Sequence, residues 1–196
     1  RRAPGFFDVV SYEGTNSGTT TDPWVKNHNL GAVPEMMWIK NIGRAGEKWN
    51  VYSKSLPITQ AMHLNQTNGA TTETTYWINP PTATEFTVGG SQGINKTGDN
   101  YMAWLWASVP GICDIGSYTG TGADLNVDCG FTNGARFILI KRTDSSGDWL
   151  YFDTLRGVTN SDSPRLRLNA IDAQNSGSYV KPLASGFTAT SNLTGI

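Results

Sequence analysis

Apolar and polar residues alternate along several short stretches of the chain. In residues 6–12 (FFDVVSY) and again in residues 112–118 (ICDIGSY), successive side chains would point to opposite faces of a strand. Residues 36–40 (MMWIK), 101–107 (YMAWLWA) and 137–141 (FILIK) are apolar on both faces, which is typical of central strands. Clusters of Gly, Asn and Pro separate these stretches, and no window has a helical apolar period. The pattern predicts an all-β protein.

The strand pattern occurs twice in the chain. The phrase APGFFDVVSYEG near the start matches VPGICDIGSYTG in the second half, with Pro4 on Pro110 and Tyr12 on Tyr118. The aligned pairs continue with Gly14 and Gly120, Ile39 and Ile140, Lys40 and Lys141, Trp49 and Trp149, Tyr52 and Phe152, Tyr76 and Tyr179, and Phe86 and Phe187. Such self-similarity indicates one structural unit per copy. We therefore expect two tandem antiparallel β-sandwich repeats, lectin-like or jelly-roll-like, over residues 1–108 and 109–196.

The two copies differ at their ends. The first copy closes with the apolar stretch 100–107, whereas the second copy stops at residues 194–196, before any equivalent stretch. Arg1 and Arg2 stand where the end of such a stretch stands ahead of Pro110. We expect the chain to be a segment of a longer array. The closing strand of the second copy could come from a continuation of the polypeptide, which the position of Arg1 and Arg2 favours, or from a neighbouring subunit; alternatively, a cut in the sequence leaves the isolated piece poorly folded.

Charge excludes several classes of partner. The chain has 15 basic and 16 acidic residues, a net charge of −1, so no basic face predicts a nucleic-acid partner. The longest apolar stretches are much shorter than the roughly 18 residues that a membrane helix needs. The sequence therefore predicts neither nucleic-acid binding nor membrane insertion.

The two cysteines, Cys113 and Cys129, both belong to the second copy. They flank a segment that fits a hairpin turning near residues 120–122, which could bring the thiols face to face. Two interpretations stay open, a disulfide or two separate buried thiols, and the second is favoured. Two cysteines do not make a disulfide framework.

Residues for catalysis or metal binding are sparse. All glutamates lie in the first copy without close pairing, so a glycoside hydrolase would have to use Asp144 and Asp148. The segment 144–148 resembles the start of a calcium loop, but Leu155 stands where a bidentate Glu belongs, so a plain hairpin turn is favoured. The two histidines, His28 and His63, fit neither a nucleophilic triad nor a zinc site. We expect a non-enzymatic protein without cofactor or metal.

Aromatic residues give the best candidates for ligand contact. Trp24 lies in a polar, Pro-containing insertion without a counterpart in the second copy, and Trp77 is replaced there by Val, so both could be exposed platforms for a sugar ring. Trp49 and Trp149 recur in both copies and are expected in the core. Arg156 follows a strand and could bind a sugar carboxylate or an acid of another subunit, or form a surface ion pair. The candidate ligand-binding residues are Trp24, Tyr76, Trp77 and Arg156.

The combination of RRAPGFFDVVSYEG, HNLGAVPEMMWIKN, YMAWLWASVPG, SYTGTG and DCGFTNGARFILIKRTDSSGDW resembles tandem β-sandwich modules of tail-fibre and appendage proteins of marine bacteriophages, cyanophages among them. The resemblance covers nearly the whole chain. It implies a virion component that is assembled in the host cytoplasm and exposed on the particle, often as a homotrimer. Its implied partners are other virion proteins and host-surface glycans. Such modules are similar in fold pattern to concanavalin-type lectins, but the resemblance supplies no site residues.

The expected function is therefore a non-enzymatic fibre or adhesin segment that contacts host glycans. Two alternatives remain: a purely structural spacer or capsid-decorating protein, and a polysaccharide depolymerase. A glycan array separates the first alternative from the expected function, and release of reducing ends from host polysaccharide tests the second.

Overall fold

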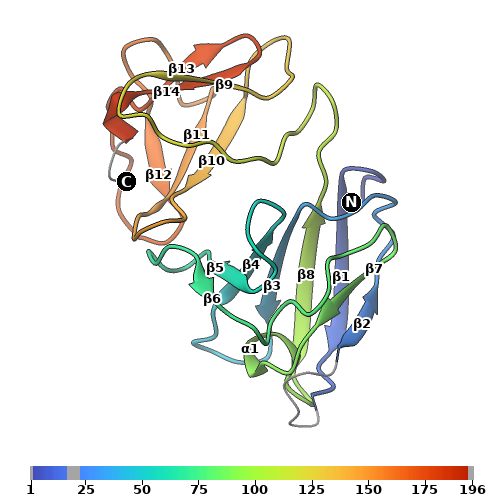
Figure 1. Cartoon of the computed structure of the whole chain (residues 1–196). Coiled ribbons are helices and arrows are strands. Elements are labelled where there is room, and N and C mark those ends of the chain that lie inside the picture. Colours follow the sequence, from blue (N-terminus) through green and yellow to red (C-terminus); the bar gives the residue numbers. More distant parts are fainter. Residues whose placement is uncertain (1, 17–22, 194–196) are drawn as a thin grey trace. The chain divides into compact units, whose positions relative to one another are not determined.

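A computed structural model describes residues 2–16 and 23–193 of the chain. Within these residues, antiparallel strands form several sheets, and the helical elements are α1 (Gln92–Asn95) and the short 3-10 helix η1 (Ser191–Leu193) (Figure 1). This confirms the predicted all-β class. The chain divides into two compact units, the first comprising Arg1–Leu64 and Ala70–Val109 and the second Asn65–Gly69 and Pro110–Ile196. Arg1 and residues 194–196, which enter the comparison of the two copies, lie outside the described residues.

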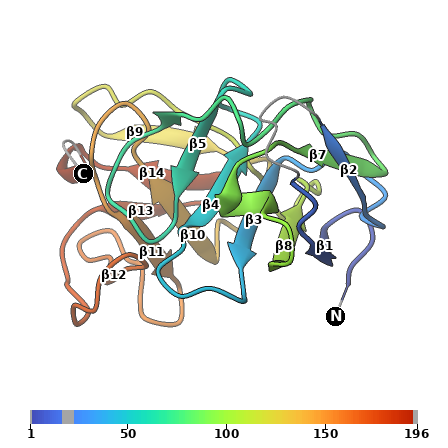
Figure 2. The same cartoon turned by 90° about the horizontal axis from the view of Figure 1, so that it is seen from below.

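The first unit has a six-stranded antiparallel sheet and a smaller two-stranded sheet. The order of the larger sheet is β1 (Phe7–Glu13), β8 (Asn100–Trp106), β3 (Met36–Asn41), β4 (Trp49–Ser53), β5 (Gln60–His63) and β6 (Thr71–Thr72). The smaller sheet pairs β2 (Trp24–Asn27) with β7 (Glu85–Val88). Helix α1 begins after Ser91, whose side chain accepts a hydrogen bond from the Gly93 amide, and it packs near β3 (Figure 2).

The core of the first unit lies on one face of the six-stranded sheet. Along β8, the odd-numbered residues 101, 103 and 105 are fully buried, whereas Met102, Trp104 and Trp106 are only partly buried. Because side chains alternate along a strand, these two sets lie on opposite faces. The buried set packs in one cluster with residues of the smaller sheet, including Phe86 and Val88. The face that carries Trp104 and Trp106 therefore points away from this core.

The second unit has two three-stranded sheets on either side of its own core. Their orders are β10 (Phe137–Lys141), β11 (Trp149–Asp153), β12 (Arg165–Arg167), and β13 (Val180–Leu183), β14 (Gly186–Ala189), β9 (Leu125–Asp128). Ile138, Leu150 and Phe152 of the first sheet share a buried cluster with Val180, Phe187 and Ala189 of the second. Each unit thus buries one face of each of its sheets.

The hairpins of the two units have the same register. Lys40 pairs with Trp49 across β3 and β4, and Lys141 pairs with Trp149 across β10 and β11. The next hydrogen bond also recurs, since the amides of Leu64 and Leu168 donate at 3.0 Å to the carbonyls of Trp49 and Trp149. These are the pairs that the sequence alignment places together.

An aromatic contact also recurs between the units. Tyr12 meets Phe86 edge-on with ring centroids 6.2 Å apart, and Tyr118 meets Phe187 edge-on at 6.1 Å. The alignment joins these residues pairwise. The segment around Tyr118 therefore lies against β14 much as β1 lies against β7.

Two expectations for the second unit are not met. The stretch 137–141 was expected to be central, but among the described residues β10 pairs only with β11 and is an edge strand. Residues 114–121 form no strand, so no hairpin joins them to β9, and Cys113 and Cys129 are not bonded to each other. The physical reason is that β1 is held by β8 in the first unit, and no described strand takes the place of β8 in the second.

Candidate functional site

The side of the six-stranded sheet opposite the core carries a continuous set of aromatic rings. We call this set the aromatic face; its members are Phe7, Trp38, Trp49, Trp104 and Trp106. Backbone pairing explains their proximity, because Trp104 lies between Val9 of β1 and Trp38 of β3. Ring centroids are 4.6 Å apart for Trp38 and Trp106, 5.3 Å for Phe7 and Trp106, and 5.3 Å for Trp49 and Trp104. All five side chains are partly exposed.

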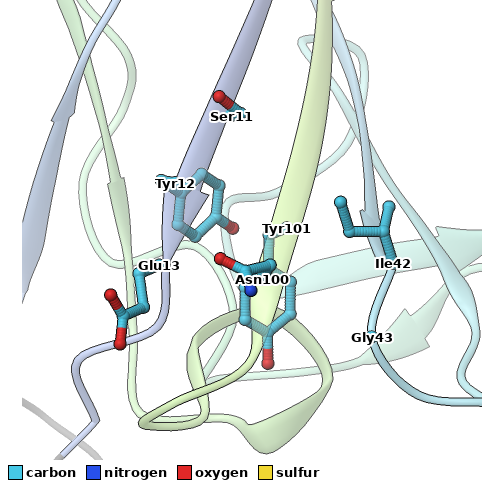
Figure 3. A pocket seen from close by; sticks show the side chains of 7 residues that line it. All are labelled: Ser11, Tyr12, Glu13, Ile42, Gly43, Asn100 and Tyr101. Carbon is cyan, nitrogen blue, oxygen red and sulfur yellow. The ribbon is translucent and has the colours of Figure 1, made fainter.

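The aromatic face continues into a hollow of about 460 Å³ at one end of the sheet, lined by both polar and apolar residues. Figure 3 shows its lining, contributed by β1, β8 and the turn after β3. Ser11, Glu13 and Asn100 are exposed and follow the same strand alternation as Phe7 and Trp104, so they point outward. Ile42, which is 57% exposed, adds an apolar edge. A hydroxyl, a carboxylate and an amide thus lie beside an apolar platform.

The tyrosines beneath this hollow belong to the core. Tyr101 is fully buried, and the ring of Tyr12 stacks on it with centroids 5.2 Å apart. The Tyr12 hydroxyl donates to the Ile94 carbonyl at 2.7 Å. Burial, with a contribution from Tyr101, raises the pKa of Tyr12 well above its ordinary value, so its hydroxyl stays protonated. These tyrosines support the hollow from below and hold no negative charge there.

The opposite end of the aromatic face is bounded by a carboxylate. Glu35, just before β3, accepts a hydrogen bond from the Ser108 amide at 3.0 Å and pairs with the Lys54 ammonium at 3.0 Å. Burial raises the pKa of Glu35, but the hydrogen bonds from Ser108 and Lys54 outweigh it, and the pKa is lowered overall. An ionised, already paired carboxylate therefore limits the face at this end.

A separate group of polar side chains is buried at the end of β5. His63 is 1% exposed; its Nε2 atom lies 3.2 Å from the Lys48 ammonium and 3.7 Å from a Glu73 oxygen. Burial, reinforced by the charge of Lys48, lowers the pKa of His63 to about 4. The imidazole is therefore neutral at pH 7 and can accept a hydrogen bond from Lys48. This group links β4, β5 and the loop around Glu73.

The structure describes no cluster suited to a metal ion. Over residues 2–16 and 23–193, no three or more His, Cys, Asp or Glu side chains gather so that they could hold one. In the segment 144–148, which could have resembled a calcium loop, Asp144 pairs with Arg142 at 2.7 Å. The segment lies in the turn between β10 and β11, as the favoured prediction of a hairpin turn has it.

Trp24 does not lie in a loop insertion, as the sequence suggested. It begins strand β2, pairs with Val88 and packs partly buried against the first core. It also has a positional counterpart, since Leu125 of β9 pairs with Ala189 in the same way. The sequence pattern did not predict this strand, because β2 is only four residues long and has polar neighbours on both sides.

The remaining predicted ligand residues are engaged by the protein itself. Trp77 is 2% exposed and Tyr76 is 7% exposed, so neither offers an open ring face to a sugar. The prediction that these two residues contact a ligand is wrong. Arg156 pairs with Asp153 at 2.7 Å and lies 4.3 Å from the centre of the Tyr151 ring, which agrees with the ion-pair alternative. Arg156 belongs to the second unit, whereas Trp24 and Trp77 belong to the first.

The recurring tryptophans differ between the two units. Trp149 is buried, as expected, but Trp49 is only partly buried on the aromatic face. Sequence reasoning also missed Trp38, Trp104 and Trp106 as outward residues. The sequence did indicate that both faces of residues 36–40 and 101–107 are apolar. It did not indicate which of the two faces the second sheet covers.

The fold and the aromatic face together define an all-β protein with an outward aromatic sheet surface. A model of the family described as a domain of unknown function, DUF7483, matches residues 3–195, and the chain belongs to this family. The match spans both units. Searches of curated proteins and of solved structures found no match. None of the helices in the described part of the chain is long and apolar enough to cross a membrane.

Proposed function

We propose that this chain is a non-enzymatic β-sandwich segment of a phage fibre or adhesin, and that its aromatic face binds host-surface glycans. The observation that carries the glycan proposal is the row of partly exposed rings on the outward side of the six-stranded sheet. The virion assignment rests on the resemblance of the sequence phrases to marine phage appendage modules. Self-association into a trimer and contacts with other virion proteins belong to the same proposal.

The chemistry of the face suits a sugar. Aromatic rings stack against the C–H surface of a pyranose, while hydroxyl, amide and carboxylate groups accept or donate hydrogen bonds to its hydroxyls. Trp104 and Trp106 supply the rings, and Ser11, Glu13 and Asn100 of the hollow supply the hydrogen-bonding groups. Among the described residues that line the hollow, Glu13 is the one with an acidic side chain. Glycoside hydrolysis commonly needs two carboxyl groups, so binding is favoured over cleavage.

A glycan array of bacterial surface oligosaccharides tests the proposal. The chain is expected to bind a subset of pyranose oligosaccharides, and Trp106→Ala is expected to weaken that binding by about tenfold, the value of one lost stacking contact. Asn100→Ala and Glu13→Gln change exposed residues of the hollow and should weaken the same ligands with little effect on folding.

The matched control is Val25→Ala on β2, whose side chain is 51% exposed and lies on the other sheet. Its binding should equal that of the unchanged chain. Absence of any glycan ligand, or equal losses for Val25→Ala and Asn100→Ala, would contradict the glycan proposal. The first result would favour the purely structural spacer.

One observation favours the spacer as second candidate. The rings of the aromatic face pack on one another, as the 4.6 Å separation of Trp38 and Trp106 illustrates, and they also stabilise the sheet itself. If the protein is a spacer, Trp106→Ala should lower its stability, and neither the variant nor the unchanged chain should bind a glycan. Thermal unfolding of the variant beside the glycan array separates the two functions.

A further inference from the structure

We propose that the free edge of β10 in the second unit is an acceptor for an added antiparallel strand, supplied by another polypeptide with large apolar residues at alternate positions. Among the described residues, β10 pairs with β11 on one side and with no strand on the other. A strand edge presents unpaired N–H and C=O groups, which another extended chain can pair with.

The first unit shows which kind of strand fits this edge. β10 has the register of β3, because Lys40 and Lys141 pair with equivalent tryptophans. In the first unit the other edge of β3 pairs with β8 along six residues, from Met36 opposite Trp106 to Asn41 opposite Tyr101. No strand of the described residues pairs with the equivalent edge of β10. A strand with the pattern of β8 therefore has a template for binding there.

The second unit also contains a counterpart of β1, the other neighbour of β8. In the first unit β8 lies between β3 and β1, and Tyr12 of β1 contacts Phe86. In the second unit Tyr118 makes the equivalent contact with Phe187, although residues 112–118 form no strand. The counterparts of both neighbours of β8 are present, and one strand between them is missing from the described residues.

The start of the edge is apolar. Phe137, the first residue of β10, is 59% exposed. Ile140 is partly buried and packs against the core of the second unit. Residues 101, 103 and 105 of β8 are fully buried in the first core, and no strand of this kind is among the described residues of the second core. These features select a partner with alternate apolar residues over a polar one.

The test uses the whole chain and a synthetic peptide that carries residues 98–108, with two lysines added at each end for solubility. We expect saturable binding, measured by fluorescence anisotropy of the labelled peptide, and slower amide hydrogen exchange in residues 137–141. A scrambled peptide of the same composition should not bind. Protection that appears at β1 or β6 instead of β10, or no binding at all, overturns the proposal.

Two N-methylated peptides provide a sharper control, because residues along a strand direct their amides alternately to the two neighbours. One peptide is methylated at positions 102, 104 and 106, and the other at positions 101, 103 and 105. One of them should bind at least about tenfold more weakly, since several backbone hydrogen bonds are lost, while the other retains pairing with β10. Equal affinity of both methylated peptides overturns strand pairing.

Variants of the chain complete the test. Phe137→Lys places a charge on the edge strand, as natural sheets do to prevent pairing, and should weaken peptide binding by about two- to fivefold. Leu155→Lys, at a side chain that is 88% exposed and outside β10, is the matched control and should bind normally. Amides of β10 that face away from β11 but already exchange slowly without peptide, in a dimer or in a monomer, show an edge that is already occupied and overturn the proposal.

Discussion

Acidification is expected to destabilise the first unit through His63. The folded protein holds this imidazole 1% exposed beside the Lys48 ammonium, and its pKa is lowered to about 4 from the ordinary value of 6.5. The unfolded chain regains the ordinary value, so between these two pH values it binds a proton that the folded state excludes. The stability contributed by the neutral imidazole is therefore complete above pH 6.5 and is lost as the pH falls toward 4.

The size of the effect follows from the two pKa values. Each pH unit within the window changes the free energy of unfolding by about 1.4 kcal/mol per proton. Between pH 7 and pH 5, which lies above the range where most carboxylates titrate, the loss amounts to about 2 kcal/mol. Burial also lowers the pKa of His28, which adds to the loss in the same direction.

Urea unfolding at pH 7, 6 and 5, followed by tryptophan fluorescence, measures this loss. In His63→Gln the titrating group is absent, while the amide oxygen can still accept from Lys48, so the variant should lose about 2 kcal/mol less over the same interval. An NMR titration of the unchanged protein should place the midpoint of His63 near 4, and Lys48→Met should raise it. The reasoning fails if the unchanged chain and His63→Gln lose equal stability between pH 7 and pH 5.

Two further predictions concern an aligned pair of glycines and the thiol of Cys129. At Gly14 an added Cβ would lie 2.0 Å from the Lys96 carbonyl oxygen, whereas at the aligned Gly120 it would meet nothing within 4 Å. Gly14→Ala should therefore lower the free energy of unfolding by about 2 kcal/mol or more and Gly120→Ala by almost nothing, and equal urea midpoints for both variants would contradict this. Burial, with the nearby Asp114 carboxylate, raises the pKa of Cys129 to about 11, so iodoacetamide at pH 8 should alkylate it on the order of a hundredfold more slowly than a small free thiol, as followed by mass spectrometry. Alkylation at the rate of free cysteine would disprove the burial argument.

The sequence determined several strands and the correspondence between the hairpins of the two copies. Alternation in residues 6–12 and the apolar stretches 36–40 and 101–107 predicted strands, which the structure contains as β1, β3 and β8. The internal alignment also placed Lys40 with Lys141 and Trp49 with Trp149, and both hairpins have that register. Such information is local: hairpin register depends on residues close in the chain and on the turns that join them.

Only the tertiary structure decided which face of each strand is covered. A period of two separates residues into two sets, but where both sets are apolar, as in β3 and β8, the pattern does not say which set meets the second sheet. Contact with β2 and β7 buries Tyr101 and Leu105 and leaves Trp104 and Trp106 outward. For the same reason Trp77 was mistaken for an exposed residue. Burial depends on segments distant in sequence, and a single strand does not encode their position.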